Sequence, residues 1–507
     1  MKNKWNGLIL TLAAAIVLVW SAQPASGESL TAYKDEDLNA SYYLSTATRV
    51  DLGLQQGRYT ISQGGTYVLS GSMTGQLVIQ APEDDTVRLV MDSAVISNPG
   101  GVAIYGLQAD KVIITLAEGS SSFISDGTGY ALDEEGADAA IYTKTDLTIN
   151  GSGSLTVNGQ TAHGIVSKDD LVITGGMLTV TSIKDGLRGK DSVAVKEGNI
   201  TITAGSDGIA ASGTETGTGL VQIDGGTFTI KAQRDGIQAE TDMTILGGNF
   251  DITTGTGAQA EAVAANVQSS AATDTVTSAT RQRNGGPQQQ SRPQDGGWQE
   301  PVTSDSATES MKALKAGASL IIKGGWFSLN AQDDAIHSNG DVIIENGTLT
   351  MTAGDDGVHA DNSVLIKAGE INILQSYEGL EGKAVTIDGG TISIAASDDG
   401  INAASGAAAA GNREAAQEGV TVTINGGTVK VIAGFDGIDS NGTIAINGGA
   451  VDLTSQRGGG GTAAIDSSGG YTHTGGEVTT NDGSEAGMGM PGGQGFGPQG
   501  NQPPRRR

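Results

Sequence analysis

The sequence contains no cysteine and few aromatic residues. None of its 507 residues is cysteine, and 4% are phenylalanine, tryptophan or tyrosine. Without cysteine the chain can form no disulfide bond, has no thiol nucleophile and offers no site for a lipoprotein anchor. Because aromatic side chains are scarce, the core has to be aliphatic and thin.

Cations are also scarce relative to anions. The chain has 29 lysines and arginines against 57 aspartates and glutamates, which gives a formal net charge of −28. Nucleic acids and anionic membranes are bound by basic surfaces, so this balance argues against both as partners. It favours solubility, bound cations, or both. Glycine is abundant instead, and its 79 copies, about twice the usual share, fit a chain that turns every few residues.

The N-terminal segment is typical of an exported protein. Lys2 and Lys4 precede an apolar run at residues 8–20, and small residues follow at 25–27. This layout predicts a secretory signal peptide over residues 1–27. An uncleaved anchor helix is the alternative, but the run is shorter than the ~20 residues needed to span a bilayer. We therefore expect a secreted protein, extracellular or associated with the cell surface, with no membrane insertion after cleavage.

A short acidic phrase recurs at intervals of about 22 residues. It reads DDAIH from Asp333, DDGVH from Asp355, YEGLE from Tyr377 and DDGIN from Asp398, and FDGID follows later. Two alternating apolar segments, separated by a GGT-like step, follow each phrase. Strand-like segments with glycine turns at such a period indicate a solenoid in which every repeat forms one turn.

Within the phrase, a small residue is followed by an aliphatic one throughout the chain. We expect the small residue to turn the chain and the aliphatic side chain to point into the coil, stacked on its equivalents at ~4.8 Å. The twelve pairs are Ala140-Ile141, Gly164-Ile165, Gly186-Leu187, Gly208-Ile209, Gly236-Ile237, Ala313-Leu314, Ala335-Ile336, Gly357-Val358, Gly379-Leu380, Gly400-Ile401, Gly437-Ile438 and Ala464-Ile465. The fold class predicted is all-β, a single-stranded parallel β-helix with three strands per turn. A propeller is disfavoured because its blades need ~40 residues.

Two insertions interrupt the period without changing it. Residues 256–308 are rich in Ala, Gln, Ser, Thr, Gly and Pro and predict a disordered loop. A second insertion, at about 406–419, lengthens one turn. We expect one β-helix domain over residues 28–483 and a disordered Gly/Pro-rich tail over residues 484–507.

The acids of the phrase predict a metal site. If they form one column, like charges lie ~5 Å apart and each carboxylate tends to take up a proton or a cation. Calcium accepts six to eight oxygen ligands and would satisfy such a column. The alternative is turn chemistry, in which aspartate caps its own backbone and glycine adopts positive φ. The candidate ligands are Asp185, Asp207, Asp235, Asp333, Asp334, Asp355, Asp356, Glu378, Asp398, Asp399 and Asp436.

Two histidines fall one turn apart, at the same point of the phrase. His337 and His359 could belong to a transition-metal site, but the sequence shows no third ligand, and alternating exposed positions on a strand explain them equally well. No HExxH, GxSxG or Walker pattern occurs.

The sequence resembles the secreted bacterial carbohydrate-binding β-helix family, whose members are similar to pectate lyases in fold and bind polygalacturonate. The resemblance covers most of residues 37–480 and rests on phrases such as DAAIYTKTDLTINGSGSLTVNG, HGIVSKDDLVITGG, DGLRGKDSVAVKEG and DDAIHSNGDVIIENG. It implies a right-handed parallel β-helix, bound calcium and an acidic plant cell-wall polysaccharide as partner. This chain departs from the family pattern at Arg234-Asp235, Ala335, Glu378 and Phe435-Asp436.

We expect a non-catalytic, monomeric binder in which calcium bridges the protein to uronate carboxylates. The candidate contacts are Lys184, Arg188, Lys190, Arg234, Lys315 and Lys383, with Trp326, Phe327, Tyr377 and Phe435 for stacking on sugars. The alternative is a polysaccharide lyase, whose elimination needs a base beside the metal. The candidate bases are Lys184, Arg188, Lys190 and Arg234. A third possibility is a matrix protein that calcium only stiffens.

Overall fold

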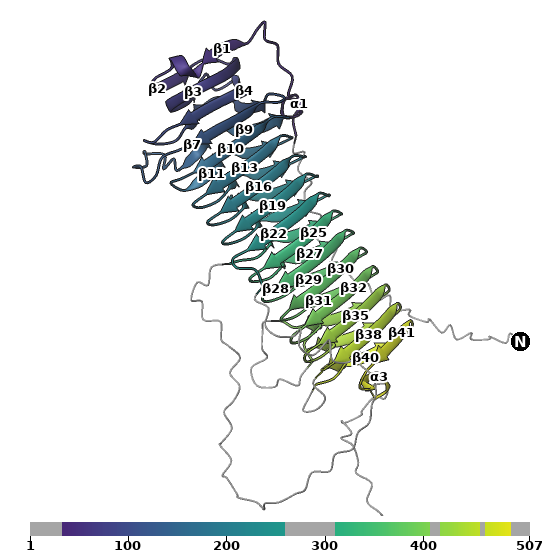
Figure 1. Ribbon diagram of the computed structural model, residues 1–507. Coiled ribbons are helices and arrows are strands. Elements are labelled where there is room, and N and C mark those ends of the chain that lie inside the picture. The colour runs from purple at the N-terminus through teal and green to yellow at the C-terminus, as the bar shows by residue number, and fades with distance from the viewer. Residues whose placement is uncertain (1–32, 259–309, 406–415, 457–461, 488–507) are drawn as a thin grey trace, which may run out of the picture.

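A computed structural model describes residues 33–258, 310–405, 416–456 and 462–487. In these ranges the chain winds into an elongated coil of stacked strands (Figure 1). The helices in them are short: α1 (Asp35–Leu38), α3 (Ser484–Gly487) and the 3-10 helix η1 (Leu52–Leu54). The predicted signal peptide and most of the two insertions lie outside the described residues. No helix in the described ranges is long and apolar enough to span a bilayer.

Each turn contributes a strand to each of three sheets, and strands of successive turns pair in parallel, which confirms the parallel β-helix. The first strands are long and cross from one sheet to the next, as β29 and β31 do later. Sheet one contains β2 (Gly57–Ile61), β3 (Gly65–Gln80), β5 (Ile104–Gln108), β8 (Ala139–Thr143), β11 (His163–Ser167), β14 (Leu187–Gly189), β17 (Ile209–Ala211), β20 (Ile237–Ala239), β23 (Leu314–Ala316), β26 (Ile336–Ser338), β29 (Val358–Ile366), β31 (Leu380–Ile387), β33 (Ile401–Ala403), β36 (Ile438–Ser440) and β39 (Ile465–Ser467).

Sheet two shares parts of β3, β29 and β31 and adds strands of its own. These are β1 (Thr48–Asp51), β4 (Thr86–Ser97), β6 (Lys111–Leu116), β9 (Asp146–Gly151), β12 (Asp170–Ile173), β15 (Ser192–Val195), β18 (Leu220–Ile223), β21 (Asp242–Ile245), β24 (Ser319–Ile322), β27 (Asp341–Ile344), β34 (Thr421–Ile424), β37 (Thr443–Ile446) and β40 (Gly470–His473).

Sheet three begins with parts of β3 and β4 and continues with the longest regular strands of the coil. These are β7 (Ser121–Ser125), β10 (Ser154–Gly159), β13 (Met177–Ser182), β16 (Asn199–Ala204), β19 (Thr227–Ala232), β22 (Asn249–Thr254), β25 (Trp326–Ala331), β28 (Thr348–Ala353), β30 (Glu370–Ser376), β32 (Thr391–Ala396), β35 (Thr428–Ala433), β38 (Ala450–Ser455) and β41 (Glu477–Thr480).

The predicted ladder of aliphatic residues is confirmed rung by rung. The twelve side chains, from Ile141 to Ile465, are successive register partners in sheet one. The ladder also extends toward the N-terminus, because Ile141 pairs with Ile104 and Ile104 with Leu77. These rungs escaped prediction because the first turns are irregular in length. Across the long insertion the register resumes with Ile237 opposite Leu314.

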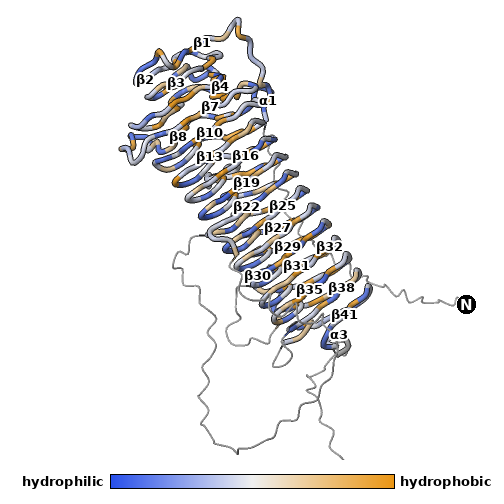
Figure 2. The backbone as a smooth tube through the Cα atoms, viewed as in Figure 1, coloured by the Kyte–Doolittle hydropathy of each residue, from blue (hydrophilic) through white to orange (hydrophobic). Residues whose placement is uncertain are grey.

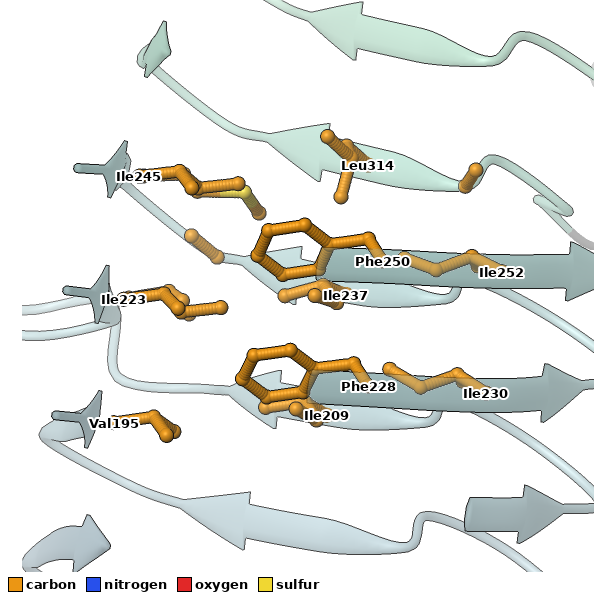
Figure 3. Close-up of a cluster of buried hydrophobic side chains, with 14 of the residues drawn as sticks. Val195, Ile209, Ile223, Phe228, Ile230, Ile237, Ile245, Phe250, Ile252 and Leu314 are labelled. Atoms are coloured by element: carbon orange, nitrogen blue, oxygen red, sulfur yellow. The ribbon is translucent and has the colours of Figure 1, made fainter. Parts of the chain in front are cut away.

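The core is aliphatic, as the composition predicts, with one aromatic stack. Hydrophobic and hydrophilic residues alternate along the strands (Figure 2), so one face of each strand lines the interior. Phe228, Phe250 and Phe327 stack with ring centroids 4.8 and 4.6 Å apart; Figure 3 labels the first two. Phe327 is fully buried, so its predicted role in stacking on sugars is wrong.

The small residue of the phrase lies at a bend, as predicted, as at Gly208, but positive φ is not the reason for its size. The glycines of this position do not have positive φ. At Gly208 an added Cβ would lie 2.5 Å from the carbonyl oxygen of Gly236 and 2.5 Å from Ile230 Cγ2. The position is therefore small because the next turn approaches closely. The turn in which glycine has positive φ is a different one and falls at the GG step, as at Gly325 with φ of 113°.

Short polar segments pack on the side of sheet two and on the last turn of the coil. Near the N-terminus, buried Asp37 of α1 accepts a hydrogen bond from Lys111 Nζ at 2.8 Å. At the other end Asp482 accepts from the backbone N–H of Ala464 at 2.8 Å, just before α3. Residues 484–487 thus form a helix where the sequence predicted disorder from Ser484 onward. The rest of the predicted tail lies beyond the described residues.

Candidate functional site

The predicted carboxylates form a column at the corner where sheet three leads into sheet one. We call this set the carboxylate column. Two members, Glu378 and Asp399, are half-buried, whereas the rest are at most 7% exposed. The column consists of Asp185, Asp207, Asp235, Asp334, Asp356, Glu378, Asp399 and Asp436. The other predicted ligands, Asp333, Asp355 and Asp398, lie one residue earlier on the same corner and are more exposed.

One oxygen of most column carboxylates holds the next turn. The backbone N–H of Asp207 donates to Asp185 Oδ1 at 3.3 Å, and that of Asp235 donates to Asp207 Oδ1 at 3.0 Å. The same bond recurs at 3.1 Å from Asp356 to Asp334 and at 2.8 Å from Asp436 to Asp399. The turn alternative predicted that each aspartate caps its own backbone. In the structure these aspartates instead cap the following turn. The second oxygen stays available for a cation.

Two column positions that the sequence analysis missed are not acidic. His163 occupies the first, where its Nδ1 accepts from the backbone N–H of Asp185 at 3.2 Å. Lys312 occupies the middle, and its Nζ lies 2.7 Å from Asp333 Oδ2 and 2.8 Å from Asp334 Oδ2. Both precede a predicted small-aliphatic pair, so their place in the repeat was visible in the sequence.

In the N-terminal half of the column, protein cations neutralise the carboxylates. Arg188 Nη1 lies 3.1 Å from Asp185 Oδ2, and Lys315 Nζ lies 3.3 Å from Asp235 Oδ2. Burial would raise the pKa of Asp185, but His163 and Arg188 lower it to about 2. Asp207 has no such cation, and burial together with Asp185 and Asp235 raises its pKa to about 6.

In the C-terminal half, lysine and arginine partners of the column are missing from the described residues, and His359 contacts Asp356 alone among the column members. In the described part of the chain, the lysine and arginine ion pairs of the column end at Asp334. Burial, followed by the charge of Glu381, raises the pKa of Glu378 to about 8. Burial and neighbouring carboxylates raise the pKa of Asp399 to about 7 and that of Asp436 to about 6. This half of the column demands protons or added cations, as predicted for an uncompensated column.

Three all-carboxylate groups bring their ligand atoms within 4.8 Å of one another and could hold a metal ion. Lysines already contact two of them. Lys312 contacts the group of Asp333, Asp334 and Asp355, and Lys34 and Lys111 lie 3.3 and 3.7 Å from an oxygen of Asp146 in the group with Asp169 and Asp170. The remaining group has no lysine or arginine partner among the described residues. We call it the C-terminal acidic cluster, and it consists of Asp436, Asp439 and Asp466.

Two members of this cluster belong to a row on the outer face of sheet one. The row is formed by the residue after each aliphatic rung, so its members are register partners. It changes from basic to acidic along the coil. We call it the outer row: Arg188, Ala210, Gln238, Lys315, His337, His359, Glu381, Asn402, Asp439 and Asp466. Asp466 was missed, although it follows the predicted rung Ile465 as Asp439 follows Ile438.

All of the predicted basic contacts except Lys383, which lies in β31 beside the C-terminal half, gather at the N-terminal half of the column. Arg188 belongs to the outer row, and Lys184 and Arg234 directly precede column aspartates. The side chain of Lys184 is 57% exposed and lies 3.8 Å from Asp138, whereas Lys190 is 43% exposed and lies 3.5 Å from Asp191. These two lysines remain accessible for an anionic ligand.

Of the remaining predicted aromatic contacts, Phe435 directly precedes Asp436 of the column, whereas Tyr377 and Trp326 are not brought together. Tyr377 is 48% exposed and lies beside the column, where its backbone N–H donates to the carbonyl oxygen of Asp355 at 2.7 Å. Trp326 is also exposed, but it begins β25 and pairs with Asn249 and Thr348. The column follows the other end of that strand, roughly 17 Å away for six residues.

A pocket of about 480 Å³ lies at the N-terminal end of the described coil, and its lining residue Ala137 directly precedes Asp138, which lies 3.6 Å from His163 Nε2 of the column. Its lining includes Arg58, Gln76, Tyr105, Tyr130 and Asp133, none of which was predicted as a site residue. The hydroxyl of Tyr105 donates to Asp133 Oδ2 at 2.7 Å.

These features define a parallel β-helix with a corner of buried carboxylates, half of them lacking a protein cation. The model of the family described as "Carbohydrate-binding domain-containing protein" matches residues 55–357 and 352–490, so the chain belongs to this family. The family predicted from the repeat phrases is thereby confirmed.

Individual relatives cover parts of the chain. A carbohydrate-binding domain-containing protein of Acetivibrio thermocellus is 34% identical over 183 residues, which are 34% of this chain and 64% of the relative. The chain thus spans a little under two thirds of the length of this relative. A solved structure of a polysaccharide lyase-like protein from C. thermocellum, a gadolinium derivative, is 34% identical and covers 41% of this chain and 91% of its own, with a TM-score of 0.40.

Proposed function

We propose that the protein is a secreted, non-catalytic binder of acidic polysaccharide and that its binding depends on calcium. The ligand proposed is a pectic, polygalacturonate-like glycan of the plant cell wall. Membership of the carbohydrate-binding family supports the glycan. The observation that carries the calcium dependence is the C-terminal acidic cluster, whose oxygens converge without a lysine or arginine partner in the described chain.

The donors of this cluster fit calcium. Asp436, Asp439 and Asp466 offer oxygen atoms only, which is the ligand type that calcium prefers. Burial and the charge of Asp466 raise the pKa of Asp439 to about 7, so a cation would relieve the cluster. Next to Asp439 in the outer row, Asn402 Oδ1 is buried without a hydrogen-bond donor. A bound cation would satisfy this oxygen as well.

Calcium would also make an acidic surface suitable for an acidic glycan. An ion held by a few carboxylates keeps positive charge and free coordination positions, which attract a uronate carboxylate. The accessible Lys184 lies on an N-terminal turn of the same corner, and the accessible Lys190 lies at the other end of β14; both can pair directly with uronates. A long glycan that follows the outer face of sheet one would meet these lysines at one end and the acidic cluster at the other.

The positions of the candidate bases support a non-catalytic role. Elimination at a uronate requires a base beside the metal. Lys184, Arg188, Lys190 and Arg234 all lie at the N-terminal half of the column, and Arg188 is paired with Asp185. Arg234 is about six turns from Asp436, roughly 29 Å at ~4.8 Å per turn. A base and the proposed calcium are therefore too far apart to act on one sugar.

The test combines two readouts on the same sample. The protein is mixed with polygalacturonate, with calcium or with an excess of chelator, and both retention on the polymer and ultraviolet absorbance of unsaturated ends are followed. We expect retention only with calcium, and flat absorbance. Rising absorbance would make the protein a lyase, and retention unaffected by chelation would exclude calcium from the interface. Absence of both signals would leave a calcium-stiffened matrix protein, which calcium-dependent melting would reveal.

A matched pair of variants localises the ion. Asp439→Asn removes a ligand of the acidic cluster, whereas Asp452→Asn removes an exposed carboxylate from β38 of the same turn. Retention should be lost in the first variant and kept in the second. Equal retention in both would place calcium elsewhere.

A further inference from the structure

The two histidines of the outer row form a compact pair at the middle of the coil. His337 and His359 are register partners of β26 and β29, and their rings stack with centroids 4.9 Å apart and planes 14° from parallel. Their side chains are 14% and 23% exposed, so they are largely enclosed. The expectation of ordinary exposed polar positions is therefore wrong for both.

The structure supplies the third ligand that the sequence did not show. Asp334 Oδ2 lies 2.8 Å from His337 Nδ1, and the ligand atoms of Asp334, His337 and His359 lie within 4.8 Å of one another. On the other side of His359, Asp356 Oδ2 lies 3.1 Å and Glu381 Oε2 lies 2.5 Å from Nδ1. The histidine pair thus lies between carboxylates of three successive turns.

The chemistry of this donor set differs from that of the acidic cluster. Imidazole nitrogen combined with carboxylate oxygen suits zinc and its first-row neighbours, whereas calcium is bound by oxygen. In a tetrahedral site with bonds of about 2.0–2.2 Å, ligand atoms are roughly 3.4 Å apart. The separations of 2.8 and 3.1 Å between carboxylate oxygens and imidazole nitrogens are close to this value. The two rings have to approach each other by a small rotation.

We propose that His337, His359 and Asp334 bind one divalent transition-metal ion of the zinc type, with Asp356 and Glu381 as the neighbouring carboxylates. This site is separate from the C-terminal acidic cluster and does not depend on the proposed calcium or glycan function. A metal bound here would link β26, β29 and β31 across three turns.

A proton competes with the metal for the same place. Asp356 and Glu381 face His359 Nδ1, and Asp361 Oδ1 lies 3.2 Å from Nε2. Burial would lower the pKa of His359, but Asp356, Glu381 and Asp334 raise it to about 11. On the other ring, His337 Nε2 contacts Asn339, and Lys312 Nζ shares Asp334 Oδ2 with Nδ1. Metal binding therefore has to displace a proton and the lysine contact, and it should strengthen as pH rises.

The experiment uses the full chain, freed of metal by chelation and dialysis. Cobalt(II) is titrated while its visible ligand-field bands are recorded, and zinc binding is measured by calorimetry. We expect one ion per chain, bands typical of a nitrogen- and oxygen-ligated site, and no displacement of cobalt by excess calcium. Absence of stoichiometric binding to the folded wild-type protein would overturn the proposal without any variant.

Variants then assign the ligands. His337→Gln and His359→Gln should each weaken cobalt binding at least tenfold, whereas His473→Gln, which changes a more exposed histidine paired with Glu485, should leave it unchanged. Asp439→Asn should abolish the calcium response and keep cobalt binding, so failure of the calcium proposal and failure of this one are distinguishable. Unchanged cobalt binding in a folded His337→Gln/His359→Gln double variant would exclude the site.

Discussion

The two halves of the carboxylate column have the same backbone arrangement but differ in how the charge of their carboxylates is compensated. From Asp185 to Asp334 the chain supplies Arg188, Lys312 and Lys315, which lie within 3.3 Å of column oxygens. From Asp356 to Asp436, His359 is the one cation among the described residues that forms an ion pair with a column carboxylate, which is Asp356. The capping bond to the next turn is common to both halves, so the aspartates are needed in both for structure.

The difference separates the structural role of the column from its binding role. A carboxylate that only capped the next turn could be neutralised anywhere by a neighbouring lysine, as happens at Asp235 and Asp334. In the C-terminal half the chain places further acids, Asp439 and Asp466, where the other half places Arg188 and Lys315. The outer row therefore increases the negative charge where the column is already uncompensated. Such an arrangement is stable only with bound protons or cations.

The largest effect should come from removing the cation in the middle of the column. In Lys312→Met, Asp333 and Asp334 lose a cation whose side chain is 13% exposed, and buried Asp334 keeps only His337 as a side-chain partner for its Oδ2. We expect a loss of about 3 kcal/mol in the free energy of unfolding, measured by chemical denaturation without calcium. Calcium should restore part of this free energy, because the variant leaves the N-terminal half with uncompensated carboxylates, as in the C-terminal half.

The control for this change is Lys323→Met, which removes an exposed lysine from the same turn and should cost little. The backbone N–H of Lys312 still donates to Asp235 Oδ1 in the variant, so the capping bond persists. A Lys312→Met protein as stable as wild type without calcium would contradict the importance of charge compensation.

The second effect is a fall in stability with rising pH when calcium is absent. Folding raises the pKa of Glu378 to about 8 and those of Asp399 and Asp439 to about 7, so the folded chain binds more protons than the unfolded one. This contribution is fully present below the unfolded pKa of about 4 and is lost as pH rises through the folded pKa values. Thermal melting between pH 5 and pH 8 should show the decline.

Calcium should flatten this dependence, because the ion replaces the protons that leave. Asp185 behaves oppositely: its lowered pKa contributes stability that is fully present above the unfolded pKa of about 4 and is lost only as pH falls toward 2, below this window. Melting temperatures that rise steadily from pH 5 to pH 8 without calcium would contradict the raised pKa values.

Much of the fold could be predicted because each turn repeats two visible constraints. A residue that the next turn approaches within van der Waals distance has to be small, and the following side chain has to fill the interior. The pairs Gly208-Ile209 and Ala335-Ile336 therefore reveal their register directly. The predicted bend at the small residue is present, but the close approach of the next turn was missed, because spacing in sequence does not reveal it.

The site was less predictable because it depends on residues that break the repeat. Lys312 replaces an acid within the column, and a search for acidic phrases passes over it. The third ligand beside the histidines, Asp334, was already assigned to the column, and only the fold shows that its second oxygen faces His337. Trp326 was misplaced because a residue on a strand can lie at either corner, which the sequence alone does not reveal.

A third, smaller effect should follow from moving a cation into the acidic half. In Asp439→Lys, the new lysine occupies the outer row and should reach Asp399 one turn back, as Lys315 reaches Asp235. Without calcium we expect a gain on the order of 1 kcal/mol in the free energy of unfolding. The response to calcium and the retention on polygalacturonate should both disappear.

Asp452→Lys is the control, because it adds the same charge on an exposed position of sheet three. If Asp439→Lys were stabilised and still retained on the glycan, cation demand and glycan binding would belong to different surfaces. If Asp439→Lys were destabilised, missing positive charge would not be what limits the stability of the acidic half.

The smallest effects concern the exposed aromatic residues, and they decide which surface the glycan follows. Tyr377 lies beside the acidic half of the column, so Tyr377→Ala should weaken retention threefold to tenfold, as expected for loss of about 1 kcal/mol of ring contact. Trp326→Ala should change retention less than twofold, because its ring lies at the far end of β25. The reverse order would place the glycan along sheet three. The contrast between the two halves of the column would then concern the stability of the coil and not the recognition of its ligand.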